Sequence, residues 1–225
     1  MTKVAIVDYG MGNLFSVKHA FEHIDVPAII SSDWKEIIDS DMVLIPGVGA
    51  FGDAMKTLHA LDLVKPLQDI AYSDKLLVGI CLGMQLLMTE SYEFGHHKGL
   101  DIIDGAVIPI EAKNSDGSPA KTPHIGWNRI YSPNQQADIW SDTPLSKQSQ
   151  GNYFYFVHSF HVSPTDQDIV NSISKYENIE FCSSLWKNRV FGCQFHPERS
   201  GTNGLSIYKT IAELINPNNT NSHIV

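Results

Sequence analysis

Cys81 has the sequence surroundings of a nucleophile. A strand-like apolar run, Leu76 to Ile80, leads into Gly79-Ile80-Cys81-Leu82-Gly83, and a helical pattern starts at about Leu82. Many hydrolases present their nucleophile on a sharp turn between a strand and a helix, where flanking glycines leave room for the backbone and a substrate. The positive end of the following helix favours the thiolate. The pattern therefore predicts a nucleophilic thiol, although a lone Cys is more often a buried structural residue.

His196 and Glu198 supply the base that such a nucleophile needs. They stand in His196-Pro197-Glu198, directly after the strand-like run Val190 to Phe195. In an extended segment, residues two apart point to the same side, so we expect the carboxylate to hold the imidazole in its orientation and tautomer. Pro197 is expected to keep the local backbone extended and to end the strand. A histidine at a strand end is more often a surface or satisfied side chain, and the sequence does not show that His196 meets Cys81.

A glycine-rich turn offers hydrogen-bond donors for a charged intermediate. Ile45-Pro46-Gly47-Val48-Gly49-Ala50-Phe51-Gly52 follows the third strand-like run, and its glycines can free backbone N–H groups to face a ligand. With the N–H of Leu82, this loop is expected to form an oxyanion hole, in which losing one donor typically costs ~3 kcal/mol. A phosphate loop and plain turns are the alternatives. Neither this loop nor Gly10-Met11-Gly12 completes a dinucleotide or Walker motif, so nucleotide binding is not favoured.

Apolar strands and amphipathic helices alternate before residue 90. Near-continuous apolar runs are typical of strands covered on both faces of a parallel sheet, and they occupy residues 4–7, 28–30, 42–45 and 76–80. Between the first two runs, Leu14, Val17, Phe21 and Ile24 recur at helical spacing. This alternation predicts an α/β fold with a doubly wound, largely parallel sheet flanked by helices. The glycine loop then lies at the carboxyl ends of the strands, where such sheets bind ligands.

The rhythm changes from about Gly105. Strand-like runs follow one another without long helices, which predicts mixed or antiparallel strands in the C-terminal half; they are 107–110, 153–157, 169–170, 181–186 and 190–195. A last helix is expected from about Gly204, and Pro217 ends it. Residues 1–217 are expected to form a single domain, followed by a polar, frayed tail at 218–225. The segment Lys113 to Pro123 is expected to be a mobile loop.

Composition excludes several classes of protein. The 225 residues carry 25 acidic and 16 basic side chains, and the resulting net charge of -9 argues against a nucleic-acid partner. No apolar run reaches the length of a membrane span, and the N-terminus lacks a signal-peptide pattern, so we expect no membrane association. The three cysteines, of which Cys182 and Cys193 fit structural positions in strands, suit a reducing compartment, and we expect a cytoplasmic protein. We expect no cofactor and no metal site.

Stretches along the whole chain resemble one family of enzymes. The Gly-Ile-Cys-Leu-Gly turn and the His-Pro-Glu strand end resemble class I glutamine amidotransferases. The chain is more closely similar to the branch formed by the glutaminase subunits of imidazole glycerol phosphate synthase, whose loop reads Pro-Gly-Val-Gly where other members commonly have Pro-Gly-Gly. The stretches that carry this resemblance are 7–14 (VDYGMGNL), 46–51 (PGVGAF), 81–86 (CLGMQL), 124–128 (HIGWN), 156–159 (FVHS) and 194–198 (QFHPE).

The resemblance implies a role for each matching residue. Cys81 would be the nucleophile, His196 the acid and base, and Glu198 the group that orients it. Backbone N–H groups of Val48 and Leu82 would form the oxyanion hole. The residues implied to bind glutamine are Gly49, Gln85, Glu93, Ser159 and Phe160. Those implied to lie near the interface with a partner are Asn13, Trp127, Tyr155 and Arg199.

Each of these roles has an ordinary alternative. Gln85 could be a helix-surface amide, and Glu93 could belong to a solvated polar run. The aromatic interface candidates could be partly buried core residues. The family often has Lys where this chain has Arg199, which keeps the charge but changes its geometry. It often has an aromatic hydroxyl in place of Phe160, at a position where the backbone is expected to act.

The resemblance implies a glutaminase that hydrolyses L-glutamine to glutamate and ammonia through a cysteine thioester. The ammonia would pass to a (β/α)8-barrel synthase subunit in a heterodimer, which forms imidazole glycerol phosphate and an aminoimidazole carboxamide ribotide in histidine biosynthesis. The family's low activity before the partner's ligand binds implies that the loop 46–49 rearranges. Three alternatives stay open. They are a related glutaminase feeding a sugar amidotransferase in polysaccharide synthesis, a cysteine peptidase or other amidohydrolase of similar fold, and a non-catalytic binding module, whose usual mark is a missing nucleophile.

Overall fold

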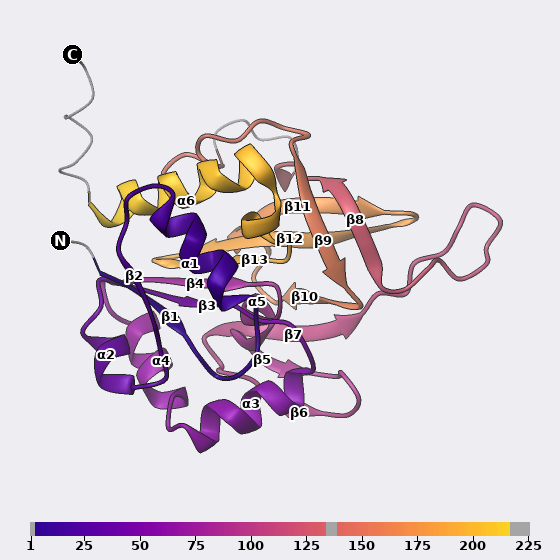
Figure 1. The fold of residues 1–225 in the computed structure, drawn as a ribbon. Coiled ribbons are helices and arrows are strands. Elements are labelled where there is room, and N and C mark those ends of the chain that lie inside the picture. Colours follow the sequence, from indigo (N-terminus) through magenta and orange to yellow (C-terminus); the bar gives the residue numbers. More distant parts are fainter. Residues whose placement is uncertain (1–2, 134–138, 217–225) are drawn as a thin grey trace, which may run out of the picture.

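Seven strands form the central sheet of the computed structural model, which describes residues 3–133 and 139–216 (Figure 1). Their order across the sheet is β11-β12-β13-β4-β3-β1-β2. The strands are β1 (Val4–Val7), β2 (Ala28–Ser31), β3 (Met42–Ile45), β4 (Leu76–Ile80), β11 (Val170–Tyr176), β12 (Ile179–Lys187) and β13 (Val190–Cys193). Strands β2, β1, β3, β4 and β13 run parallel, and β12 and β11 continue the sheet antiparallel. The predicted α/β fold with a largely parallel sheet is confirmed.

Helices cover both faces of this sheet. On one face lie α1 (Leu14–Glu22) and α6 (Gly201–Ile215), and on the other lie α2 (Trp34–Ile38), α3 (Phe51–Ala60) and α4 (Val64–Ala71) (Figure 1). Ile6 and Leu44 pack into a hydrophobic cluster with α1 and α6, whereas Val7 and Ile45 pack into a second cluster with the other three helices. Successive residues of a strand point to opposite faces, so the continuous apolar runs supply both cores at once.

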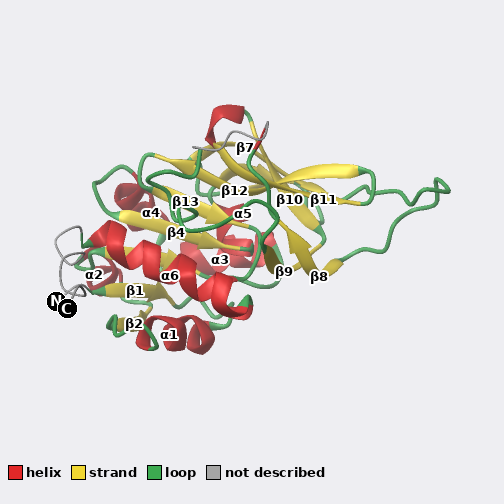
Figure 2. Cartoon of the chain, turned by 90° about the horizontal axis from the view of Figure 1, so that it is seen from above, coloured by secondary structure: helices red, strands yellow, loops and turns green. Residues whose placement is uncertain are grey.

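The later part of the chain adds a smaller sheet and an antiparallel strand pair (Figure 2). The four-stranded sheet has the order β10-β7-β5-β6 and contains β5 (Met88–Ser91), β6 (His97–Lys98), β7 (Ile103–Pro109) and β10 (Phe160–Pro164). The strands β8 (His124–Arg129) and β9 (Tyr153–His158) pair only with each other in the described chain. The expected mixed and antiparallel strands are confirmed, although this sheet also takes β5 and β6, which precede Gly105.

Three element boundaries differ from the sequence expectation. The helix after Cys81 is α5 (Leu82–Leu86), and Met88 already belongs to β5 because it pairs with Ile103. The strand expected to reach Phe195 is β13, which ends at Cys193. The last helix starts at Gly201, earlier than its apolar stripe indicates, because its first turn is largely exposed. Pro217 and the tail 218–225 lie outside the described residues.

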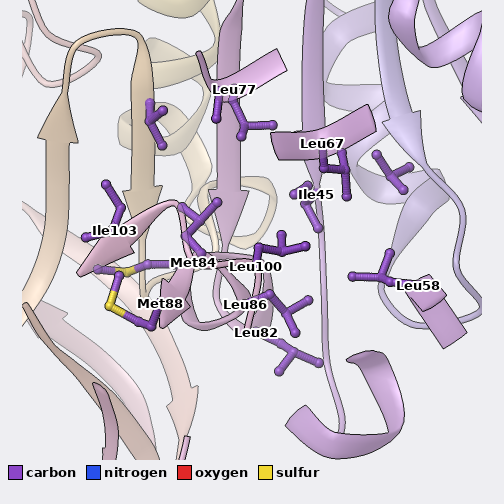
Figure 3. Close-up of a cluster of buried hydrophobic side chains, with 14 of the residues drawn as sticks. Ile45, Leu58, Leu67, Leu77, Leu82, Met84, Leu86, Met88, Leu100 and Ile103 are labelled. Atoms are coloured by element: carbon purple, nitrogen blue, oxygen red, sulfur yellow. The ribbon is translucent and has the colours of Figure 1, made fainter. Parts of the chain in front are cut away.

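Buried side chains fix the short helix α5 against the central sheet. Leu82, Met84 and Leu86 belong to the same cluster as Ile45 of β3 and Leu77 of β4 (Figure 3). All three helix side chains are at most 2% exposed. A five-residue helix has little stability of its own, so this packing is what holds the turn after β4 in place.

Candidate active site

The three catalytic candidates meet at the carboxyl ends of neighbouring parallel strands. Cys81 follows β4, and His196 follows β13, the strand beside it. The two connections are tied together, since the Cys81 N–H donates to the Cys193 carbonyl at 2.7 Å. The glycine loop follows β3, on the other side of β4. Residues far apart in sequence are thus adjacent because the sheet topology makes their strands neighbours.

Cys81 occupies a strained turn. Its φ of 54° and ψ of -109° lie in a region that a residue with a side chain rarely adopts, and the cysteine is only 6% exposed. The expected role of the flanking glycines as space for the backbone fits this geometry. A Cβ on Gly83 would overlap the Ile45 carbonyl oxygen, and a Cβ on Gly79 would lie 2.7 Å from the Gly83 carbonyl. Only glycines let strand, turn and helix come this close.

His196 and Glu198 form a buried pair. His196 Nδ1 lies 2.7 Å from Glu198 Oε1, and the two side chains are 4% and 2% exposed. The expected reason for this contact is wrong: Pro197–Arg199 form a 3₁₀ turn, η3, instead of an extended segment. Proline is well tolerated at the first position of such a turn, and the turn brings the carboxylate back to the ring.

Charge around His196 favours its imidazolium. Burial alone lowers the pKa of this ring, but the neighbouring Cys81 sulfur and the Glu198 carboxylate outweigh burial and raise the pKa to about 10. With Nδ1 held by Glu198, the second ring nitrogen, Nε2, has no hydrogen-bond partner among the described residues. That nitrogen is available for proton exchange with a reacting group.

Two buried amides connect Cys81 with the neighbouring cavity wall. Gln194 Nε2 donates to Cys81 Sγ at 3.5 Å, and Gln194 Oε1 accepts from Gln85 Nε2 at 3.1 Å. Gln85 Nε2 also donates to the Phe160 carbonyl at 3.1 Å. Cys81 Sγ itself lies 3.8 Å from the Val157 carbonyl of β9. The sulfur therefore sits in a defined hydrogen-bonding environment.

A cavity of about 250 Å³ opens beside Cys81. The residues expected to bind glutamine and to form the oxyanion hole all line it, and the structure brings them together: Val48, Gly49, Leu82, Gln85, Glu93, Ser159 and Phe160. Pro123, Val157 and His158 complete the wall. Glu198 does not line this cavity; it lines a separate one of about 370 Å³.

The glycine loop is anchored at its start and open at its tip. The Tyr9 hydroxyl donates to the Pro46 carbonyl at 2.6 Å, and this tyrosine is 1% exposed. Val48, at the tip, is 46% exposed, and Gly49 has a φ of 116° that disfavours any side chain. The loop is therefore held at Pro46 and exposed to solvent at Val48.

Glu93 accepts a hydrogen bond that the sequence does not predict. Its Oε2 accepts a hydrogen bond from the backbone N–H of Phe51 at 2.5 Å, at the start of α3. A carboxylate is stabilised at this end of a helix by the free N–H groups and the helix dipole. This contact fixes Glu93 at the cavity wall, where one further carboxylate oxygen remains for a ligand.

Three of the four interface candidates lie together on the outside of the molecule. The Trp127 and Tyr155 rings meet edge to face with centroids 6.2 Å apart, and the Arg199 guanidinium lies 4.3 Å from the Tyr155 centroid. Trp127 is 56% exposed. The side chain of the fourth candidate, Asn13, caps the start of α1 by accepting a hydrogen bond from the backbone N–H of Ser16 at 3.4 Å.

Two residues of the site, Gln194 and His158, were not predicted from the sequence. Both stand inside stretches that carry the family resemblance, but nothing in their type or spacing indicates a contact with Cys81 or the cavity. They became visible only when the strands were placed.

Among residues 3–133 and 139–216, no group of three or more potential ligands could hold a metal ion. None of the helices in that part of the chain combines the length and apolar character needed to cross a membrane.

The chain belongs to the class I glutamine amidotransferase family. The model of that family, described as Glutamine amidotransferase class-I, matches residues 5–211. Imidazole glycerol phosphate synthase subunit HisH 1 of Legionella pneumophila (strain Paris) is 41% identical over 214 residues, which are 95% of this chain and 100% of that protein. The HisH subunits of Geobacter sulfurreducens and Bacillus subtilis are each 39% identical, over 95% and 91% of this chain and 100% and 92% of their own lengths.

Solved structures with low sequence identity share the fold. The structure of PurLQS from Thermotoga maritima superposes with a TM-score of 0.67 at 20% identity, covering 94% of this chain and 98% of that chain. A glutamine amidotransferase from Thermotoga maritima gives a TM-score of 0.61 at 10% identity, over 96% and 98% of the two chains. These similarities support the architecture, and they leave substrate and partner to the site itself.

Proposed function

We propose that this chain is the glutaminase subunit of an imidazole glycerol phosphate synthase, with Cys81, His196 and Glu198 as its catalytic residues. One observation carries the proposal: Cys81, on a strained turn, interacts with the buried His196–Glu198 pair and lines a cavity together with the expected glutamine-binding residues. The near-full-length identity with HisH subunits supports the choice of pathway. In this proposal residues 1–217 form one glutamine amidotransferase domain, of which the family model covers 5–211.

Hydrolysis proceeds in two halves. The Cys81 thiolate attacks the side-chain amide carbon of glutamine, and the N–H groups of Val48 and Leu82 stabilise the oxyanion. His196, as imidazolium, gives its Nε2 proton to the departing nitrogen, which leaves as ammonia from the γ-glutamyl thioester. His196 then takes a proton from water, whose oxygen attacks the thioester. Glutamate leaves, and the thiolate–imidazolium pair is restored.

The cavity residues orient the substrate. Glu93, fixed through Phe51 N, presents its remaining carboxylate oxygen to the α-amino group of glutamine. Gln85 and the backbone at Gly49, Ser159 and Phe160 hold the amino-acid end. The ammonia passes to a (β/α)8-barrel synthase subunit, which docks on the face that carries Trp127 and Tyr155. The heterodimer and the expected cytoplasmic location stay predictions.

Replacing the nucleophile tests this proposal. Cys81→Ala combined with the purified barrel subunit is expected to lose glutamine-dependent product formation and to keep the ammonium-dependent reaction. Cys182→Ala is the matched control, because this buried cysteine lies in β12 away from the turn. Loss of both activities in Cys81→Ala would show that the chain does not serve as an ammonia source. Retention of both would remove Cys81 from the mechanism.

The partner's ligand and the substrate separate the alternatives. Stimulation of glutamine hydrolysis by the barrel subunit with its phosphoribosyl ligand supports the synthase assignment. Glutaminase activity that does not respond to this ligand would favour a related subunit that feeds another amidotransferase. Turnover of peptides in preference to glutamine would identify a peptidase of similar fold.

A further inference from the structure

The β8–β9 strand pair presents two faces of opposite character. Its register pairs Trp127 with Tyr155 on the outer face, and Trp127 is 56% exposed. The alternate pairs point inward, and among them His124 pairs with His158; these two side chains are 4% and 5% exposed. Because both faces share one backbone, a displacement of the strand pair moves the outer side chains and the inward-pointing ones, here called the inner row, together.

The inner row contains a continuous chain of hydrogen bonds. Asn128 Nδ2 lies 3.2 Å from His124 Nε2, and His124 Nδ1 lies 2.9 Å from His158 Nε2. His158 Nδ1 lies 2.8 Å from the Phe160 carbonyl oxygen. Asn128 is held from behind, since its Nδ2 also donates to the Lys175 carbonyl at 2.8 Å. The chain runs from β8 across β9 to the wall of the cavity.

Only one arrangement of protons satisfies every member of this chain. The Phe160 carbonyl can only accept, so His158 Nδ1 carries the proton. Burial lowers the pKa of His158 to about 3 and that of His124 to about 4, so both rings are neutral at pH 7. His158 Nε2 must then accept from His124 Nδ1–H, and His124 Nε2 must accept from the Asn128 amide. The chain therefore has a fixed direction, from Asn128 to Phe160.

The end of the chain is shared with the catalytic network. The Phe160 carbonyl that accepts from His158 also accepts from Gln85, and Gln85 is joined through Gln194 to Cys81 Sγ. Two donors converge on this one oxygen, so its position reflects both networks. A shift in His158 thus reaches the segment 159–160 that is expected to hold the amino-acid end of the substrate.

We propose that Asn128, His124 and His158 are positioning residues that set the glutamine-binding segment 159–160 according to the placement of the β8–β9 pair. This inference rests on the proposed glutaminase function. A partner seated on the outer face moves the strand pair as a unit, and the neutral histidines pass that movement to the Phe160 carbonyl. The residues act through Phe160 and Gln85, without touching the reacting atoms.

His124→Phe tests the chain with little change in packing. The His124 ring packs against Phe156, Tyr176 and Phe181, with centroids 4.3 to 5.8 Å away, and a phenyl ring keeps these contacts while it removes both nitrogens. We expect KM for glutamine to rise about tenfold and kcat to change less than threefold, because substrate placement is lost and the triad is intact. His124→Gln, which keeps one donor and one acceptor, should recover at least half of that loss on a logarithmic scale.

The matched control is Tyr176→Phe. It removes a hydrogen bond from the Tyr176 hydroxyl to the Lys121 carbonyl, beside the same His124 ring and outside the chain, so KM should stay within twofold of wild type. Asn128→Leu is a second variant, on a half-buried side chain, for the case that His124→Phe does not fold. Its effect on KM should not add to that of His124→Phe in the double variant, because both break one chain.

The outcomes separate this inference from the function on which it rests. If the wild type is active and KM is unchanged in folded His124→Phe and Asn128→Leu, the proposed role of the hydrogen-bond chain is wrong, and the proposed glutaminase function is unaffected. Additive effects in the double variant, or an equal rise of KM in Tyr176→Phe, assign the change to general loosening and also overturn it. If the wild-type complex does not hydrolyse glutamine, both the proposed function and the proposed role of the hydrogen-bond chain are wrong.

Discussion

The neutral histidines of the inner row predict how stability responds to acid. His124 and His158 have folded-state pKa values of about 4 and about 3, whereas an exposed histidine in the unfolded chain has a pKa of about 6.5. Between these values the unfolded chain binds protons that the folded protein refuses, so stability falls as pH falls. Lowering the pH from 7 to 5 costs about 2 kcal/mol for each of the two histidines.

His196 changes stability in the opposite direction. Its folded pKa of about 10 lies above the unfolded value, so its contribution is complete below about pH 6.5 and is lost as pH rises through 10. Lowering the pH from 7 to 5 therefore increases the stabilisation from His196 by about 1 kcal/mol. The three histidines together therefore predict a net loss of about 3 kcal/mol over this interval, which is a large part of an ordinary domain's stability.

A difference measurement isolates His124 from every other titrating group. Urea unfolding of wild type and His124→Phe at pH 7, 6 and 5 gives the stability difference between the two proteins at each pH. Wild type should lose about 2 kcal/mol more than the variant between pH 7 and pH 5, because only wild type carries His124, whereas both proteins keep His158. A stability difference that does not change with pH would refute the assignment of a buried neutral His124. A larger loss of stability in His124→Phe than in wild type would also refute this assignment, because the pH effect would then have the opposite sign.

Three further substitutions test other parts of the structure. Gly83→Ala places a methyl group on the Ile45 carbonyl and should lower the free energy of unfolding by roughly 3 kcal/mol or more, measured by thermal or urea unfolding. Gly117→Ala is the control: it has open space at a φ of 82° and should cost only about 1 kcal/mol. Equal losses would argue against the close approach of α5 to β3. Gln194→Leu removes the donor to Cys81 Sγ and should lower kcat/KM for glutamine by about tenfold to a hundredfold. Gln68→Leu, which loses a hydrogen bond to the Leu100 carbonyl, should retain wild-type kinetics. A fully active Gln194→Leu would exclude a role for the contact with Cys81. Trp127→Ala should raise the Kd for the barrel subunit, measured by calorimetry, at least tenfold, and Trp34→Ala, which removes another exposed tryptophan, should not; equal affinities for both variants would place the partner elsewhere.

Local pattern in the sequence predicted the parallel half of the fold because the signal there is itself local. Each buried strand is a continuous apolar run, and alternation with helices leaves few other topologies. The cysteine turn was recognisable for the same reason, since Gly79 and Gly83 are required by backbone contacts within one strand–turn–helix unit. Met88 and its neighbours were misread because their strand forms by pairing with Ile103, a contact that no local pattern records.

The contact between His196 and Glu198 was predicted correctly, but the backbone conformation that brings them together was not. An extended His196-Pro197-Glu198 and a 3₁₀ turn both bring the first and third residues together, and proline is compatible with either. Ser200 decides between them, because its hydroxyl donates to the His196 carbonyl at 2.6 Å, and this bond cannot form from an extended segment. Contacts of this kind, like those of Glu93 and Gln194, arise from tertiary placement and leave no mark in the spacing of residues.

The backbone of strand β9 contacts both His196 and Cys81, and its outward side chains belong to the proposed docking face. The His196 N–H donates to the Tyr155 carbonyl at 2.9 Å, while the Tyr155 N–H donates to Ser200 Oγ at 3.0 Å. Two residues further along the same strand, the Val157 carbonyl lies 3.8 Å from Cys81 Sγ. The strand therefore spans the gap between base and nucleophile on its backbone, and its outward side chains form the proposed docking face. In the proposed complex, a partner docked on Trp127 and Tyr155 would therefore act on the spacing of His196 and Cys81 through the β9 backbone, and on the segment 159–160 through His124 and His158.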